Sequence, residues 1–181
     1  MEEYIDIINK ETGDNTGERK LKSEVHRDGL WHKTVHIWCV NLKNEILLQH
    51  RSKDKKNYPD MWDISIAGHI SSGEDSKTGA IREIKEEIGI DILDSDLKFL
   101  STVVQEVILN NGTYVDNEFN DIYLVILNMD NQKLHIQEEE LDDLQWISIP
   151  ELKKWVAEKR PDLVPHESEC NILFDYLENL N

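Results

Sequence analysis

Three glutamates in the middle of the chain have a spacing that could hold a divalent metal ion. On a helix of about 3.6 residues per turn, Glu83, Glu86 and Glu87 stand at i, i+3 and i+4, so their side chains share one face. Like charges on one face repel each other, whereas a helix selected only for stability would alternate its charges. Clustered carboxylates become favourable when a hard dication such as Mg²⁺ lies among them. Taken alone, the spacing fits a solvated acidic face equally well.

A dication at this position would serve a reaction at phosphate. It neutralises phosphate oxygens, stabilises developing charge and helps to generate a hydroxide nucleophile, as cleavage of a diphosphate bond requires. Arg82 stands four residues before Glu86 and can hold or orient that carboxylate. Ile81, Ile84 and Ile88 fall on a different arc and are expected to face the core. The sequence therefore predicts a helix with one chemical face and one packing face.

The remaining pattern predicts an α+β sandwich in which helices pack against a mixed sheet. The glutamate-bearing helix is expected over Ser76–Ile88, with Gly89 as its end. Alternating or β-branched runs predict strands at residues 2–10, 34–41, 45–51, 61–68, 97–109, 118–128 and 144–148, with hairpins at 34–51 and 97–128. Further helices are expected near Pro150 and over residues 167–177. Residues 11–20 are expected only to turn the chain.

Size and composition limit the class of protein. A chain of 181 residues favours a single domain over 1–181, with an N-terminal strand and hairpin at 1–66, the glutamate-rich stretch at 68–90 and C-terminal helices at about 150–178. No apolar run reaches the roughly 20 residues of a membrane span, and the acidic N-terminus lacks the features of a signal peptide. Cys39 and Cys170 are far apart, so we expect buried thiols and a cytoplasmic protein.

The formal charge of −17 bears on the choice of partner. An acidic surface repels a polyanionic backbone, so neither long nucleic acid nor a membrane is an expected partner. A small phosphorylated substrate is compatible with this charge, because a bound metal ion reverses the local field. One dense basic cluster interrupts the acidic sequence, formed by Arg51, Lys53, Lys55 and Lys56. It is either a solvated loop or a place where phosphate is captured beside the active site.

The stretch at residues 68–90 resembles a known family motif. It fits the pattern G-x5-E-x7-R-E-U-x-E-E-x-G-U of the Nudix box, where U is aliphatic, with Gly68, Glu74, Arg82, Glu83, Ile84, Glu86, Glu87, Gly89 and Ile90 at the fixed positions. Ordinary residue frequencies make a chance match rarer than about one in 10⁵. The resemblance implies a Nudix α/β/α sandwich with a mixed central sheet. It also implies a metal-dependent hydrolase that cleaves a diphosphate bond in a nucleoside diphosphate derivative or a related small phosphorylated metabolite.

The same resemblance assigns roles to individual residues. It implies a site for Mg²⁺ or Mn²⁺ made by Glu83, Glu86, Glu87 and the backbone carbonyl of Ala67. It implies structural support from Gly68, Glu74 and Gly89. Family members commonly place another acidic residue on a later strand, as a metal ligand or as the base that activates water, and Glu118 is the candidate here. The implied catalytic set is Arg82, Glu86, Glu87 and Glu118.

Residues 46–70 look like the Nudix subgroup related to isopentenyl-diphosphate isomerase. That isomerase binds its own metal through three histidines and two glutamates, and the residues near the corresponding places are His26, His32, His69, Asp116 and Glu118. They imply a second metal site, substrate contacts or inherited geometry. Ala67 stands where the isomerase carries its catalytic cysteine, and a methyl group neither donates nor accepts a proton. Hydrolysis is therefore the predicted reaction, and isopentenyl-diphosphate isomerisation is the alternative.

Several further features admit more than one interpretation. His36 alternates with Trp38 along a strand, which fits either core packing or a substrate wall. His50 is expected at the surface, and Trp31 or Trp62 could line a base pocket. A homodimer is compatible with the resemblance. The leaving group is not determined, because nucleoside diphosphates, nucleoside triphosphates, nucleotide sugars and non-nucleotide diphosphates all fit the motif.

Overall fold

A seven-stranded mixed sheet forms the centre of the computed structural model, which describes residues 3–129, 133–137 and 141–179. Its strands are β3 (His32–Asn41), β4 (Glu45–Arg51), β5 (Trp62–Asp63), β6 (Ile66–His69), β7 (Leu97–Leu109), β8 (Tyr114–Leu127) and β9 (Leu141–Ser148). The main path runs β5-β4-β3-β8-β7, while β6 pairs with β3 and β9 pairs with β4. Within this sheet β3 and β8 are parallel, and the other pairings of the described strands are antiparallel.

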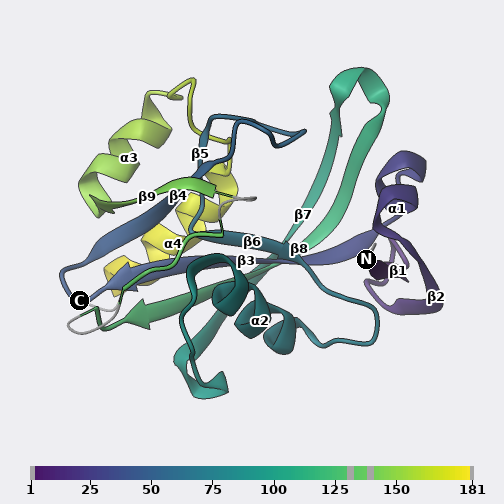
Figure 1. Ribbon diagram of the computed structural model, residues 1–181, viewed down its shortest axis with the longest axis horizontal. Coiled ribbons are helices and arrows are strands. Elements are labelled where there is room, and N and C mark those ends of the chain that lie inside the picture. The colour runs from purple at the N-terminus through teal and green to yellow at the C-terminus, as the bar shows by residue number, and fades with distance from the viewer. Residues whose placement is uncertain (1–2, 130–132, 138–140, 180–181) are drawn as a thin grey trace.

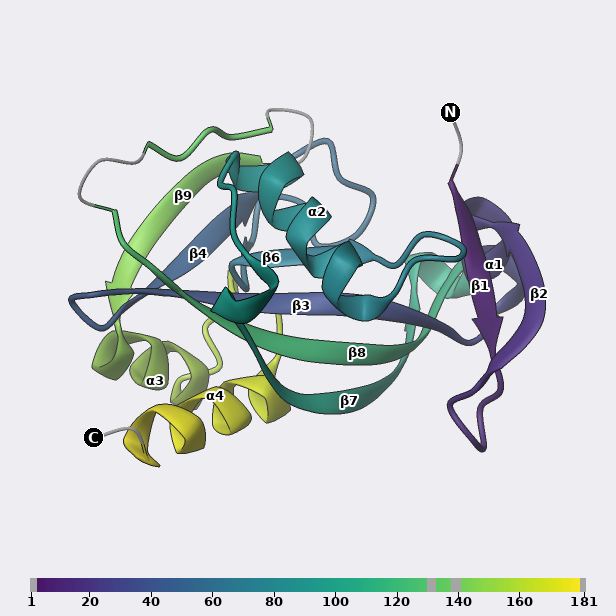
Figure 2. The same cartoon turned by 90° about the horizontal axis from the view of Figure 1, so that it is seen from below.

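Helices cover both faces of this sheet. Figure 2 shows α2 (Ser76–Ile88) on one side, and α3 (Ile149–Ala157) and α4 (Glu167–Asn179) on the other. At one end of the molecule, β1 (Tyr4–Ile8) and β2 (Asn15–Leu21) form a separate two-stranded sheet, which is followed by α1 (Lys22–Asp28) (Figure 1). Short 3₁₀ turns at Asp94–Asp96 and Asn110–Gly112 flank β7. These layers confirm the predicted α+β class and the α/β/α sandwich.

Strand alternation sends the side chains of β3 into two different cores. Val35 and Ile37 pack in the core that contains Ile84 of α2. Trp38 and Val40 pack in the core on the side of α3 and α4. Successive side chains of a strand point to opposite faces of the sheet, so one apolar run serves both layers of the sandwich.

The strand register brings predicted site residues together. On one edge of β3, the parallel pairing with β8 places His32 opposite Glu118. On the other edge, β6 places Ala67 opposite His36, and His69 follows two residues later. His32 and His36 are an even number of residues apart and therefore lie on the same face of the sheet. The sheet thus gathers histidine and acidic side chains that are distant in the sequence.

Local sequence defines both ends of α2. Asp75 caps the first turn, since its side chain accepts a hydrogen bond from the Thr78 backbone N–H at 2.9 Å. The helix ends at Gly89, whose φ of 73° lies in the left-handed region that favours glycine. Ile84 and Ile88 are fully buried against the sheet. The predicted bounds of this helix, Ser76–Ile88, are confirmed.

The N-terminal region differs from its prediction. The predicted turn at residues 11–20 is wrong in part, because residues 15–21 form β2, and α1 has no counterpart in the sequence prediction. No residue of β2 is buried, so no hydrophobic alternation marks this strand, and its order comes from backbone pairing with β1. Helix α1 is equally hard to detect, because only Val25 and His26 are buried along its length.

The predicted strand at residues 61–68 is interrupted in the middle. It forms β5 and β6, which are separated by Ile64 and Ser65. Ser65 Oγ donates to the Leu47 carbonyl at 2.6 Å and accepts from the Cys39 N–H at 2.8 Å, so a side chain replaces strand pairing here. The two predicted hairpins and the helices near residues 150 and 167 are confirmed. No helix of the described ranges is both long and apolar enough to cross a membrane.

Candidate active site

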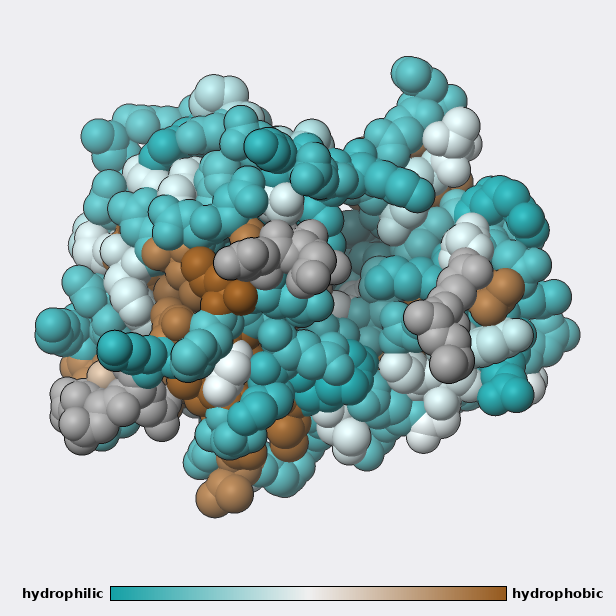
Figure 3. All heavy atoms as spheres, viewed as in Figure 1, coloured by the Kyte–Doolittle hydropathy of each residue, from teal (hydrophilic) through white to brown (hydrophobic). Residues whose placement is uncertain are grey.

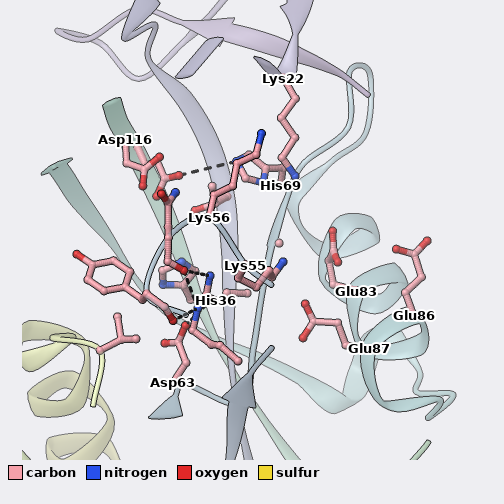
Figure 4. Close-up of a pocket in the computed structure, with 18 of the residues that line it drawn as sticks. Lys22, His36, Lys55, Lys56, Asp63, His69, Glu83, Glu86, Glu87 and Asp116 are labelled. Carbon is pink, nitrogen blue, oxygen red and sulfur yellow. Dashed lines mark hydrogen bonds and ion pairs between the residues drawn. The ribbon is translucent and has the colours of Figure 1, made fainter. Parts of the chain in front are cut away.

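A cavity of about 600 Å³ opens where β6, α2, the loop after β4 and the β7–β8 hairpin meet. In Figure 3 the hollow lies beside the projecting hairpin, among mostly hydrophilic residues. Figure 4 shows Glu83, Glu86 and Glu87 along one wall, with His36 and Asp63 on the opposite side. Most of the residues that the sequence singles out therefore face one common space.

The α2 wall contains carboxylates that burial makes difficult to ionise. Glu87 is only 5% exposed, and within the described chain its Oε2 has no hydrogen-bond partner. Burial raises the pKa of Glu87 well above the usual carboxyl range, and the charge of Glu83 adds to this effect. Burial also raises the pKa of Glu83, although Arg82 partly opposes it. Glu86 differs from both, because its side chain is 50% exposed. Buried acids of this kind are stabilised by a bound dication.

Arg82 organises this wall from the middle of α2. Its Nη1 donates to Glu83 Oε1 at 2.7 Å and to Glu86 Oε2 at 3.1 Å. Its Nε and Nη2 donate to Glu74 at 3.1 and 2.9 Å, and Nη2 also donates to the His69 carbonyl at 2.9 Å. Glu74 in turn accepts from a backbone N–H of the loop before α2 at 3.1 Å. Arg82 and Glu74 therefore tie this loop and β6 to the helix.

Glycine is required at position 68 because a carboxylate occupies the space of a side chain. A Cβ added to Gly68 would lie 2.0 Å from Cδ of Glu83. Glu83 thus packs directly against the β6 backbone, next to Ala67, which also lines the cavity. Gly89 is constrained by its positive φ, and an added Cβ there would lie 3.0 Å from Cβ of His135. Steric crowding therefore explains why both positions of the motif, Gly68 and Gly89, require glycine.

Three histidines from separate elements meet at another side of the cavity. His26 on α1, His32 on β3 and His69 on β6 place ring nitrogens within 4.8 Å of one another. His26 Nδ1 lies 2.9 Å from Asp116 Oδ1, and His32 Nε2 lies 3.3 Å from Glu118 Oε1. Figure 4 shows His69 and Asp116 in this region. The structure thus brings together all five residues that the resemblance points to, and we call them the histidine cluster.

The histidine cluster has the donor chemistry of a metal site. Among the described residues, His32 Nε2 and Asp116 Oδ1 are buried without a well-aligned hydrogen bond. Burial lowers the pKa of His69 well below its usual value and raises the pKa of Asp116. Burial alone would raise the pKa of Glu118, but the His32 ring, whose Nε2 lies 3.3 Å from Glu118 Oε1, lowers it. A neutral imidazole and an ionised carboxylate are the forms that bind a metal ion.

Cations reach the cavity from two segments of the chain. Arg51, Lys55 and Lys56 of the predicted basic cluster line it, whereas Lys53 lies outside the lining. Burial lowers the pKa of Lys55 to about 8, and the charge of Arg51 contributes. Lys22 also lines the cavity, although no sequence pattern marks it, because only the folding of β2 and α1 carries it there. Three of the four residues of the basic cluster therefore line the cavity.

A series of buried ion pairs forms the side of the cavity near α4. Arg51 Nη1 donates to Asp63 Oδ2 at 2.9 Å, and Asp63 Oδ1 lies 2.9 Å from His166 Nε2. His166 Nδ1 lies 3.3 Å from Glu169 Oε1, and both Glu169 oxygens lie 3.0 Å from His36 Nδ1. We call these five residues the ion-pair chain. His36 is buried and lines the cavity, so of its two interpretations the structure favours the wall.

Opposite charges determine the protonation of the ion-pair chain. Burial would lower the pKa of His166, but Glu169 and Asp63 raise it to about 10. Burial would raise the pKa of Glu169, but His36 and His166 lower it. The pKa of Asp63 is also lowered, because His166 outweighs the effect of burial. Sequence reasoning misses Asp63, His166 and Glu169, because they are isolated in the sequence and meet only in the folded chain.

Other candidate residues lie away from the cavity. Trp31 and Trp62 do not line it, which contradicts a base pocket made by either. His50 is half-buried, with 22% of its side chain exposed, and it packs on Trp62 with ring centroids 4.8 Å apart. The predicted buried thiols are confirmed, and burial raises the pKa of Cys39 and of Cys170 to about 12. Neither cysteine lines the cavity.

Known proteins share both the sequence pattern and the fold. A family model of the NUDIX domain matches residues 30–166. The chain is 37% identical to Nudix hydrolase 3 of Arabidopsis thaliana over 181 residues. This alignment covers 97% of this chain and 23% of that protein. It is also 28% identical to isopentenyl-diphosphate Delta-isomerase 2 of Photorhabdus laumondii over 153 residues. That alignment covers 84% of this chain and 81% of the isomerase. The crystal structure of DR0079 from Deinococcus radiodurans gives a TM-score of 0.70 at 17% identity, covering 94% of this chain and 97% of that one.

An α/β/α sandwich with a glutamate-rich wall on its central helix defines the class of protein. The chain belongs to the Nudix hydrolase family, in a subgroup that resembles isopentenyl-diphosphate isomerase. The predicted family and fold are thereby confirmed. The chain spans 23% of the Arabidopsis relative, so the match covers only part of that protein.

Proposed function

We propose that this chain is a metal-dependent pyrophosphohydrolase that cleaves the diphosphate bond of a nucleoside diphosphate derivative or a related small phosphorylated metabolite. One observation carries the proposal: buried carboxylates of α2 line the same cavity as Arg51 and Lys55, and Figure 4 shows Lys55 between these glutamates and His36. Carboxylates can hold a dication, and the cations can hold phosphate oxygens. A volume of about 600 Å³ suits a small metabolite.

Glu83 and Glu87 are the residues best placed to hold Mg²⁺ or Mn²⁺, together with Glu86 and the carbonyl of Ala67. The burial of Glu87 and its unpartnered Oε2 fit a hard cation that takes oxygen ligands. Such an ion, when bound, neutralises phosphate oxygens and helps to activate water. Arg82 acts through the carboxylates that it hydrogen-bonds, so we assign it as a positioning residue.

The cationic side of the cavity would bind the substrate's diphosphate. Arg51 ends β4, Lys55 and Lys56 stand in the loop that follows, and Lys22 begins α1, so these cations come from two separate segments of the chain. Partial burial strengthens the attraction between an ammonium group and a phosphate, because less water screens the charges. Their arrangement would leave the substrate's organic group in the remainder of the cavity.

Hydrolysis adds a water molecule to one phosphorus, breaks the bridging P–O bond and releases a proton. Glu118 is our candidate to orient that water or to accept its proton, because it borders the cavity and its pKa is lowered by His32 despite burial. Its contact with His32 supports a further assignment, as a ligand of a second metal ion in the histidine cluster. Both assignments predict that Glu118→Gln lowers the rate at saturating substrate and metal, by about 10²- to 10⁴-fold. An unchanged rate together with an unchanged pH–rate profile would remove Glu118 from the mechanism.

Isopentenyl-diphosphate isomerisation is the second candidate function, because the histidine cluster does assemble. That reaction moves a proton across a carbon skeleton and needs acid–base groups on both faces of the alkene. Ala67 can supply no proton, and neither Cys39 nor Cys170 lines the cavity. We therefore rank hydrolysis above isomerisation.

A panel of nucleoside diphosphates, nucleoside triphosphates, nucleotide sugars and isopentenyl diphosphate, with product identification, tests the proposal. We expect phosphate-bearing cleavage products in the presence of Mg²⁺ or Mn²⁺, and none after the metal is chelated. Formation of dimethylallyl diphosphate at an enzymatic rate would favour the isomerase instead. A panel in which no compound is cleaved with either metal would contradict the proposed hydrolysis.

Location and assembly are proposals from sequence and family alone. We infer a cytoplasmic protein that forms a homodimer and binds a small phosphorylated substrate. The net charge of −17 supports the choice of a small metabolite over long nucleic acid or a membrane. Sedimentation of the purified chain would test the dimer.

A further inference from the structure

The loop between β4 and β5, residues 52–61, brings two cations to the cavity. Lys55 and Lys56 both line it, and Figure 4 shows both among the residues around it. A long, flexible side chain loses conformational freedom when it binds an anion, and this loss is smaller when the backbone that carries it is already held. The contacts that hold this loop therefore affect how well the two lysines bind phosphate.

Arg51 holds the base of the loop. Its Nη2 donates to the Asn57 carbonyl at 2.9 Å and its Nε to the Tyr58 carbonyl at 3.1 Å. Its Nη1 donates to Asp63 Oδ2 at 2.9 Å, and Asp63 is buried. Each nitrogen of the guanidinium group thus has a partner in the chain, and the two loop carbonyls are fastened to the end of β4.

The loop backbone has a conformation that its own residues disfavour. Tyr58 has a φ of 47° and Asp60 a φ of 60°, in the left-handed region that favours glycine. Residues other than glycine stay in such a conformation when surrounding contacts hold them there. The contact of Arg51 with the Tyr58 carbonyl supplies one such restraint.

A second restraint comes from the other side of the cavity. Asn110, at the tip of the β7–β8 hairpin, donates from Nδ2 to Asn57 Oδ1 at 2.8 Å. Figure 1 shows the loop after β4 reaching toward this tip. Asn57 is thus held twice, by Arg51 through its carbonyl and by Asn110 through its side chain, and it directly follows Lys56. We call the hydrogen bond between Asn57 and Asn110 the clasp.

The clasp joins two segments that project from the body of the protein. The pairing of β8 with β3 begins at Glu118, so among the described strands residues 106–117 of the hairpin pair only with each other. Ile108 near the tip is 70% exposed, so the tip is not packed into a core. The hairpin also brings Tyr114 and Asp116 to the cavity. The clasp therefore connects the cationic loop to the wall that carries part of the histidine cluster.

We propose that Asn57 and Asn110 are positioning residues, which hold Lys55 and Lys56 where they bind the diphosphate of the substrate. The inference rests on the proposed function, because the proposed hydrolysis requires a diphosphate at these lysines. Asn110 does not line the cavity, and neither amide is charged, so Asn110 acts only through the loop that it holds. A single exposed hydrogen bond contributes modestly, which sets the expected size of the effect.

Two neighbouring glycine substitutions at the hairpin tip test the clasp. Asn110→Gly removes its donor, and Asn111→Gly is the matched control. Both residues have a positive φ, 51° and 56°, which glycine accepts, and no hydrogen bond or ion pair between described residues joins Asn111 to the loop. The probe is methylenediphosphonate with Mg²⁺, because its P–C–P bridge resists hydrolysis, and calorimetry measures its Kd. We expect Asn110→Gly to raise the Kd about 3- to 10-fold and Asn111→Gly to leave it unchanged.

A second comparison tests whether the clasp acts through the lysines. In a Lys55→Gln background the effect of Asn110→Gly on the Kd should be smaller, because one of the groups that the clasp positions is already absent. A loss of general stability would instead weaken binding equally in both backgrounds. Equal Kd values for the two glycine variants, or an undiminished effect without Lys55, would overturn the inference and leave the proposed hydrolysis intact.

Failure of the wild type to bind methylenediphosphonate counts against the proposed function, and amide hydrogen exchange then decides the inference without a ligand. The Lys55 amide donates to the Ser52 carbonyl at 3.0 Å inside the loop. Faster exchange of this amide in Asn110→Gly than in Asn111→Gly supports the clasp. The same exchange rate in both variants overturns it.

Discussion

Glu87 and Glu169 are buried carboxylates on opposite sides of one cavity, and their electrostatic surroundings are opposite. Glu87 on α2 has an unpartnered Oε2, and burial and Glu83 raise its pKa. Glu169 on α4 contacts His36 and His166, which lower its pKa in spite of burial. The two side chains are similarly buried, at 5% and 1% exposure. Counter-charges, and not the depth of burial, therefore distinguish them.

This difference separates a side of the cavity that reacts from a side that supports. A buried carboxylate without a counter-charge is unfavourable until a cation arrives, whereas a paired one is part of the protein's own structure. The α2 wall should therefore change its charge state when metal binds, and the ion-pair chain should not. Removing a charge should consequently impair activity on one side and stability on the other.

Glu87→Gln should give the largest effect and should spare the fold. The change keeps the size of the side chain but removes a metal ligand, so we expect activity to fall by about 10³-fold or more. The free energy of unfolding without metal should be unchanged or higher, because a buried group that resists ionisation is lost. Steady-state kinetics and urea unfolding measure the two effects. Glu158→Gln, at the exposed C-cap of α3 and outside the cavity lining, is the matched control. Wild-type turnover by Glu87→Gln would show that the assigned metal site is wrong.

His166→Gln should show the opposite pattern. It leaves Asp63 and Glu169 buried without their shared cation, and breaking a buried pair in this way costs roughly 3–5 kcal/mol. Urea unfolding followed by fluorescence measures the loss. Lys77→Gln removes an exposed ion pair with Asp94 and should change stability far less. Equal effects of the two substitutions would mean that the ion-pair chain is not a stabilising structure.

Lys55→Gln should affect substrate binding more than the chemical step. Lys55 lines the cavity, so its loss should raise KM about 10-fold through a lost charge-assisted contact with phosphate. Lys53→Gln is the control from the same basic cluster, because Lys53 is exposed and outside the lining. Initial rates over a range of substrate concentrations distinguish KM from kcat. A similar KM in both variants would show that Lys55 does not bind phosphate and that the basic cluster is a solvated loop.

The smallest expected effect is a pH dependence of stability. Folding raises the pKa of His166 from about 6.5 to about 10, so the folded chain retains this proton more tightly. The contribution of His166 is therefore complete below about pH 6.5 and is lost as the pH rises toward 10. The lowered pKa of Glu169 acts in the opposite direction, and its contribution is lost as the pH falls below the usual carboxyl range.

Urea unfolding of the wild type and of His166→Gln at several pH values tests this dependence. The difference between their unfolding free energies should be constant in mild acid and should shrink as the solution becomes alkaline. A difference that stays constant from pH 6 to pH 10 would show that His166 is not held as a cation.

Helix α2 illustrates how much of a site local sequence can predict. Helical periodicity places Glu83, Glu86 and Glu87 on one face, and Asp75 and Gly89 define the two ends. These features depend on contacts between residues about four positions apart, so they are present in the sequence itself. The same pattern does not separate Glu87 from Glu86, although the first is buried and the second is half exposed. That distinction depends on which part of the face β6 and the neighbouring loop cover.

By itself, the sequence determined the family motif, the chemical face of α2 and the layer order of the sandwich. Only the tertiary structure decided what the rest of the cavity contains. His36 meets Glu169 across 133 positions, and Asp63 meets His166 across 103. Each stands in an ordinary local pattern, and none of these patterns encodes a partner so far away. The packing of α4 against one face of the sheet brings them together, and the resulting burial and pairing of charges give these side chains their properties.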